Sequence, residues 1–159
     1  LDFDIQEWDM TKIVKEIYTT HQVSIQSSLQ FQLELDETIS LPVHVDRFRF
    51  TQVISNFLSN ANKFTRSGYI TLGCETDKKH HEVRIYVKDS GKGIGDEELM
   101  MIFDRFYKSD EFEQGSGLGL PICKVIIEKL SGRIEVHSEV GKGSCFTVIL
   151  SLASTPENN

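Results

Sequence analysis

Two asparagines and a lysine, spaced by about one helical turn, are the residues of this chain best suited to hold a polar ligand. Residues 46–65 predict a helix, because apolar residues recur there every three or four positions. Beside the apolar stripe runs a polar one: Arg49, Gln52, Asn56, Asn60 and Lys63. Asparagine is a poor helix former, so its repetition favours the floor of a polar pocket. A solvated helix edge is the alternative, and the pattern alone leaves both open.

Glycines supply a second chemical signal, because a backbone without Cβ atoms can approach a phosphate closely. Eight of the eleven glycines fall in three clusters: Gly91/Gly93/Gly95, Gly115/Gly117/Gly119 and Gly141/Gly143. The second cluster leads straight into an expected helix at Pro121 and is the best phosphate candidate. For the last cluster, a plain turn is an equally good interpretation.

Several familiar site signatures are absent from the sequence. There is no P-loop, and the glycines at 115–119 do not complete a Rossmann fingerprint. The loops of eukaryotic-type protein kinases and the spacings of zinc sites are also missing. A nucleotide would therefore have to bind by another design.

The elements that must position these residues mix helices and strands without regular alternation. Helices are expected at 8–27, 46–65 and from 121 to Ser131-Gly132, the last with Ile122, Val125, Ile126 and Leu130 as its buried stripe. Strands are expected at 31–35, 41–45, 69–75, 82–88, 133–138 and 145–152. The fold class predicted is α/β: a two-layer sandwich with a mixed, largely antiparallel sheet and helices packed on one face.

Composition describes an ordinary soluble domain of 159 residues with a net charge of −7, which argues against nucleic acid as the main partner. No run is long and apolar enough to span a bilayer, and no signal peptide is visible. Three widely spaced cysteines indicate reduced thiols. Because the chain begins at Leu1, we expect it to be a piece of a longer protein.

The order of the motifs resembles the ATP-binding catalytic domain of bacterial sensor histidine kinases, a branch of the GHKL superfamily with the Bergerat fold. Five stretches carry the resemblance, over about residues 30–152. They are the asparagine box at 56–65, the first glycine box at 89–95, the phenylalanine box at 103–108, the second glycine box at 115–120 and a further glycine element at 141–146.

The resemblance implies ATP and Mg²⁺ as cofactors. Asp89 would accept a hydrogen bond from the adenine amino group, and Asn60 would ligate Mg²⁺ with Asn56 beside it. Asn56 and Lys63 would be the catalytic residues, and residues 96–115 the ATP lid. The full set of nucleotide contacts that the resemblance implies is Asn56, Asn60, Lys63, Asp89, Gly91, Gly93, Ile94, Gly95, Phe103, Phe106, Tyr107, Lys108, Gly115, Gly117, Leu118, Gly119, Leu120 and Thr147.

The resemblance also implies a reaction and partners. Asn56 stands where related hydrolases carry a water-activating glutamate, and a carboxamide is no general base, which favours transfer to histidine over hydrolysis. None of the five histidines has the context of the family's acceptor. We therefore expect the acceptor on a separate dimerisation domain and a response regulator receiver domain downstream.

The domain boundaries expected are 1–27 as a connection to that dimerisation domain, 28–153 as the catalytic domain, and 154–159 as a frayed tail. The resemblance implies a cytoplasmic domain without direct membrane contact, and leaves open whether its parent is anchored in the inner membrane. A nucleotide-sensing module without catalysis and a GHKL ATPase are the alternative functions.

Overall fold

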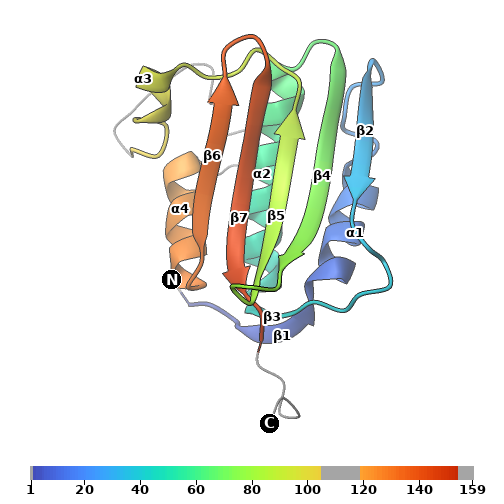
Figure 1. Cartoon of the computed structure of the whole chain (residues 1–159), viewed down its shortest axis with the longest axis vertical. Helices are drawn as coiled ribbons and strands as arrows, with labels where there is room; N and C mark the ends of the chain where they lie inside the picture. The colour runs from blue at the N-terminus through green and yellow to red at the C-terminus, as the bar shows by residue number, and fades with distance from the viewer. Residues whose placement is uncertain (1, 105–118, 154–159) are drawn as a thin grey trace.

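The fold is a sheet covered on one face by helices, seen in a computed structural model that describes residues 2–104 and 119–153 (Figure 1). The strands are β1 (Gln6–Asp9), β2 (Leu29–Glu34), β3 (Pro42–Val45), β4 (Gly68–Asp77), β5 (Glu82–Asp89), β6 (Arg133–Glu139) and β7 (Gly143–Ser151). The helices are α1 (Met10–His21), α2 (Arg47–Phe64), α3 (Asp96–Leu99) and α4 (Leu120–Lys129). None of the helices in these residues is long and apolar enough to cross a membrane.

The main sheet has five strands in the order β2-β4-β5-β7-β6. Strand β2 pairs with β4 in parallel, and the other neighbours are antiparallel. Strands β1 and β3 form a separate antiparallel pair. Helices α1, α2 and α4 lie behind the sheet in Figure 1, with α2 in the middle. The predicted two-layer α/β class is confirmed.

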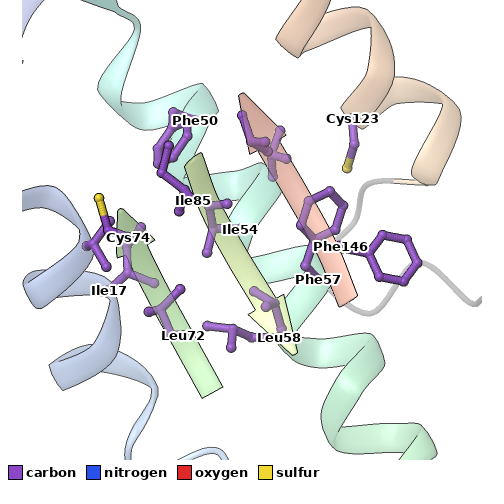
Figure 2. Packing of buried hydrophobic residues seen from close by; sticks show 14 of the residues in the cluster. Ile17, Phe50, Ile54, Phe57, Leu58, Leu72, Cys74, Ile85, Cys123 and Phe146 are labelled. Carbon is purple, nitrogen blue, oxygen red and sulfur yellow. The ribbon is translucent and has the colours of Figure 1, made fainter. Parts of the chain in front are cut away.

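Helix α2 is the element on which the core is built. It begins at Asp46, whose Oδ1 accepts the main-chain N–H of Arg49 at 3.0 Å and so caps the helix. Its apolar face is fully buried against β4, β5 and β7 (Figure 2). Burying each such side chain contributes about 1.5–3 kcal/mol relative to exposure, so α2 is fixed firmly relative to the sheet.

Helix α1 is shorter than predicted and belongs to the same core. It begins after Asp9, which accepts the N–H of Thr11 at 3.1 Å, and Trp8 lies instead in β1, opposite Val43. Met10 and Ile13 are buried in the cluster that α2 organises. Residues 10–21 therefore pack into the same hydrophobic core as the sheet.

Helix α4 buries a face that overlaps the one predicted only in part. Ile126 and Leu130 are buried as predicted, together with Cys123 and Ile127, whereas Ile122 and Val125 are 42% and 45% exposed. Burial raises the pKa of Cys123 to about 12, and that of Cys74 likewise, so both thiols stay protonated and unreactive at neutral pH.

Candidate functional site

The polar row on α2 divides into two halves with different surroundings. Asn56 and Asn60 are buried, with exposed fractions of 1% and 6%, and Asn60 donates its side-chain N–H to Oδ1 of Asn56 at 3.3 Å. Arg49, by contrast, donates to the carbonyl of Asp2 and stacks on Phe3. Asn60 therefore lines the pocket and Asn56 lies buried beside it, as the pocket interpretation expects of the row, whereas Arg49 holds the N-terminal segment.

Asp89 places a buried carboxylate at the end of β5. It is 7% exposed, and its Oδ1 accepts the main-chain N–H of Gly91 at 2.8 Å and of Ser144 at 3.3 Å. Among the described residues no donor reaches Oδ2. Burial raises the pKa of Asp89 above its usual range, and the two amides partly oppose this shift.

Asn60 and Asp89 open into one shared pocket between α2, the end of β5, the glycine loop at 91–95, α3 and β7. Its apolar and aromatic walls face a few polar groups, which is the usual make-up of a small-molecule site. The lining residues are Phe57, Asn60, Ala61, Phe64, Val87, Asp89, Lys92, Gly93, Ile94, Glu98, Ser144 and Phe146.

Two glycines of the predicted motifs allow backbone segments to meet around Asp89. A Cβ atom on Gly91 would lie 2.6 Å from the carbonyl oxygen of Phe64, so this glycine lets the loop pack against the end of α2. Gly143 has φ +117°, and a Cβ there would lie 2.0 Å from the carbonyl oxygen of Asp89. The turn at 139–143 thus packs closely against the main chain of Asp89 and supports it.

Lys92 is a pocket residue that the sequence interpretation passed over. It lines the pocket, and its ammonium lies 5.1 Å from the ring centroid of Phe64. Lys63, predicted for this site, lies over the same ring at 5.7 Å and is exposed rather than part of the pocket wall. Lys92 stands between Gly91 and Gly93 in the sequence, and a cation between phosphate-type glycines is a signal that could have found it.

Thr147 does not belong to this site, and its prediction as a nucleotide contact is corrected. Successive residues of a strand point to opposite faces. Ser144 and Phe146 of β7 line the pocket, so Thr147 faces the other side of the sheet, where its hydroxyl lies 3.7 Å from the thiol of Cys145. Ser144 takes its place.

The remaining predicted contacts lie within or near residues 96–115, the expected lid, in the sequence. Gly93 and Ile94 line the pocket, and Gly95 precedes α3. Phe103 packs edge-on against Phe146 at 6.5 Å without lining the pocket. Gly119 precedes α4, and Leu120 is buried in the core. The predicted contacts that fall outside the described residues are Phe106, Tyr107, Lys108, Gly115, Gly117 and Leu118.

A sheet covered by helices on one face, with a pocket that pairs the buried carboxylate of Asp89 with the helical Asn60, is the arrangement of a nucleotide-binding domain of the Bergerat type. A family model described as "Histidine kinase-, DNA gyrase B-, and HSP90-like ATPase" matches residues 45–154. Sensor protein SrrB of Staphylococcus aureus is 46% identical over 110 residues, which are 66% of this chain and 18% of that protein.

Solved structures agree with this match. The catalytic domain of histidine kinase ThkA superposes with a TM-score of 0.80 at 28% identity, over 94% of this chain and 96% of that one. Full-length ShkA in complex with AMPPNP gives a TM-score of 0.82 at 23% identity, over 98% of this chain and 32% of that one, and supports the fold alone.

The chain belongs to the family of histidine kinase-, DNA gyrase B- and HSP90-like ATPases. Within that family it is an ATP-binding catalytic domain of the sensor histidine kinase kind. It spans 18% of the length of the SrrB proteins that it matches.

Proposed function

We propose that this chain binds Mg²⁺-ATP in the pocket between α2 and β5 and transfers the γ-phosphoryl group to a histidine of a separate dimerisation domain. The observation that supports this most directly is that Asn60 and Asp89, on different elements, line one pocket with apolar walls. A planar base can lie against those walls, while the polar groups read its edge and hold the phosphates.

Asp89 is the residue proposed to read the adenine. Its Oδ1 is engaged by the amides of Gly91 and Ser144, which fix the plane of the carboxylate. Oδ2 is then the oxygen that can accept a hydrogen bond from the amino group of the base. A hydrogen bond to a charged acceptor contributes about 1.5–3 kcal/mol, enough to orient the ligand.

Asn60 is the residue proposed to hold Mg²⁺, and its surroundings fit that role. Its N–H is taken by Asn56, and no described donor bonds to its Oδ1, which leaves an amide oxygen for a hard cation. Mg²⁺ commonly keeps several waters and takes only one or two protein ligands besides phosphates. When bound, the cation neutralises the charge that develops on the phosphates.

Lys63 and Lys92 would add positive charge beside the phosphates. Both ammonium groups lie over the ring of Phe64, which itself lines the pocket. Electrostatic stabilisation of this kind is the main contribution that a protein makes to phosphoryl transfer.

Asn56 distinguishes transfer from hydrolysis. It is buried, and its carboxamide cannot remove a proton from water at neutral pH. Asn56 therefore cannot activate water, which favours a protein imidazole as the nucleophile. The partners that follow are a dimerisation domain carrying the acceptor histidine and a receiver domain that takes the phosphoryl group from it.

The test has two parts. Titration with an ATP analogue should show binding that strengthens with Mg²⁺ and that falls at least tenfold in Asp89→Asn, with Asp77→Asn on the exposed hairpin as the control. Incubation with γ-labelled ATP should leave this chain unlabelled and should label an added dimerisation domain of the parent kinase. Absence of binding, or stable labelling of the isolated chain, would contradict the proposal.

A further inference from the structure

A serine outside every motif named above connects the two sides of the pocket. The hydroxyl of Ser138, in β6, accepts the main-chain N–H of Ile94 at 2.7 Å and donates to the carbonyl of Gly143 at 3.0 Å. It also lies 2.7 Å from the hydroxyl of Ser144. Ile94 and Ser144 both line the pocket, so Ser138 joins the glycine loop to β7 at the pocket wall.

These contacts allow only one arrangement of hydroxyl protons if all three are hydrogen bonds. A serine hydroxyl has a single proton and can accept two hydrogen bonds. Because Ser138 gives its proton to Gly143, Ser144 must give its own proton to Ser138. The hydroxyl of Ser144 is then left with lone pairs only for whatever lies in the pocket.

Ser144 stands beside the carboxylate of Asp89, because its main-chain N–H donates to Oδ1 of that residue. An ionised carboxylate also offers only acceptors. Asp89 and Ser144 therefore form a surface that favours a ligand with N–H donors and opposes one with a carbonyl oxygen at the same place. Adenine carries an amino group at position 6, whereas hypoxanthine and guanine carry an oxygen there.

We propose that Ser138 is a positioning residue that sets the base preference of the pocket: by taking the proton of Ser144, it keeps the end of the pocket an acceptor for the 6-amino group of adenine. This inference rests on the proposed nucleotide binding. Without Ser138, the hydroxyl of Ser144 can rotate and donate to a 6-oxo group, so the discrimination against such purines should weaken.

The test compares the affinities for ADP and for inosine diphosphate in the wild-type chain, Ser138→Ala and Ser138→Thr. One hydrogen bond typically changes affinity by about two- to tenfold. We expect Ser138→Ala to narrow the preference for ADP by about that factor, and Ser138→Thr, which keeps the hydroxyl, to retain it. Ser151→Ala, at the exposed end of β7, is the control for removing a serine from the sheet.

Two further variants separate base preference from folding. In Ser144→Ala, the added Ser138→Ala change should no longer alter the preference, because its effect passes through Ser144. If Ser138→Ala does not fold, Ser138→Cys should show the same narrowing, since a thiol accepts hydrogen bonds poorly.

The outcomes distinguish the two proposals. If Ser138→Ala loses affinity equally for both nucleotides, or if neither affinity changes, the proposed role of Ser138 in base preference is overturned and Ser138 is a structural residue. The proposed nucleotide binding is unaffected by either outcome. A wild-type chain that binds neither nucleotide would overturn the proposed function itself.

Discussion

The side chain of Asn60 donates to that of Asn56 across 3.3 Å, one turn apart on α2 and beside the apolar stripe that forms the hydrophobic core. This contact engages the amide N–H of Asn60, so under the proposed function its oxygen is the atom that faces a ligand. The two asparagines thus differ in position: Asn60 lines the pocket, and Asn56 accepts its hydrogen bond.

Replacing Asn60 by alanine should remove the part of ATP affinity that depends on Mg²⁺. The metal would lose its protein oxygen, while the base would keep Asp89. We expect ATP affinity in Mg²⁺ to fall at least tenfold and affinity in EDTA to change less than twofold, measured by calorimetric titration. Equal losses with and without the metal would contradict Asn60 as its ligand.

Asn56→Asp should raise the rate of ATP hydrolysis. The substitution keeps the shape and the acceptor of the hydrogen bond from Asn60 but adds a group that can take a proton from water. General bases typically contribute at least about a hundredfold, so a tenfold rise is a conservative expectation for an imperfectly placed one. Phosphate release gives the rate, and Asn62→Asp, outside the pocket on the same helix, should leave it unchanged.

ADP affinity should fall on acidification at a pH above that expected for an ordinary aspartate. Burial raises the pKa of Asp89, so the carboxylate gains a proton earlier as the pH falls, and it then stops acting as a pure acceptor. The folding stability of the free domain depends on pH in the opposite direction from ADP affinity. Because the pKa of Asp89 is raised in the folded state, Asp89 becomes less favourable for stability as the pH rises through that pKa. Titrations across pH 4–8 should show this loss in the wild type and a flatter profile in Asp89→Asn.

Lys92→Ala should weaken ATP binding without weakening adenosine binding. The ammonium lies beside the aromatic wall of the pocket, so it can reach phosphates but has no role in reading the base. We expect a fall of about three- to tenfold for ATP, smaller at high salt because screening reduces the attraction. Lys88→Ala, on the preceding strand and outside the pocket lining, is the matched control, and a parallel loss for adenosine would argue against a phosphate contact.

Gly143→Ala should destabilise the domain more than Gly141→Ala does. Both residues have positive φ, which costs a residue with a Cβ about 1–2 kcal/mol. A Cβ on Gly143 would also strike the carbonyl of Asp89, whereas one on Gly141 would meet nothing within 4 Å. We expect the Tm to fall further for Gly143→Ala than for Gly141→Ala, and ADP binding to weaken for Gly143→Ala only; similar losses in both variants would contradict the support of Asp89 by this turn.

The sequence predicted the parts of the site that depend on local pattern. Asn56 and Asn60 stand out because asparagine is unfavourable in a helix, whereas Asp89 was implied only by the family resemblance. Helix α2 was predicted because apolar residues recur along residues 46–65. These signals are contained within a few turns of chain and need no knowledge of the tertiary structure.

The errors lie where the tertiary arrangement decides between faces. Helix α4 has two possible apolar stripes, made from Ile122, Val125, Ile126 and Ile127. Only the position of the sheet selects the stripe that includes Ile127. Thr147 was assigned to the site although residues of the other parity, such as Ser144, face the pocket. Ser138 carried no local signal, since its importance comes from strands that meet far apart in sequence.

The turn at 139–143 has a practical consequence for following the ligand. Its tip residue Val140 is 69% exposed, while Gly141 donates its N–H to the carbonyl of Lys92 at 2.7 Å. A fluorophore attached at Val140 would therefore lie in bulk solvent. It would be one residue from Gly141, whose hydrogen bond reaches the pocket residue Lys92. Such a probe would convert occupancy of the site into an optical signal without altering any group that touches the base.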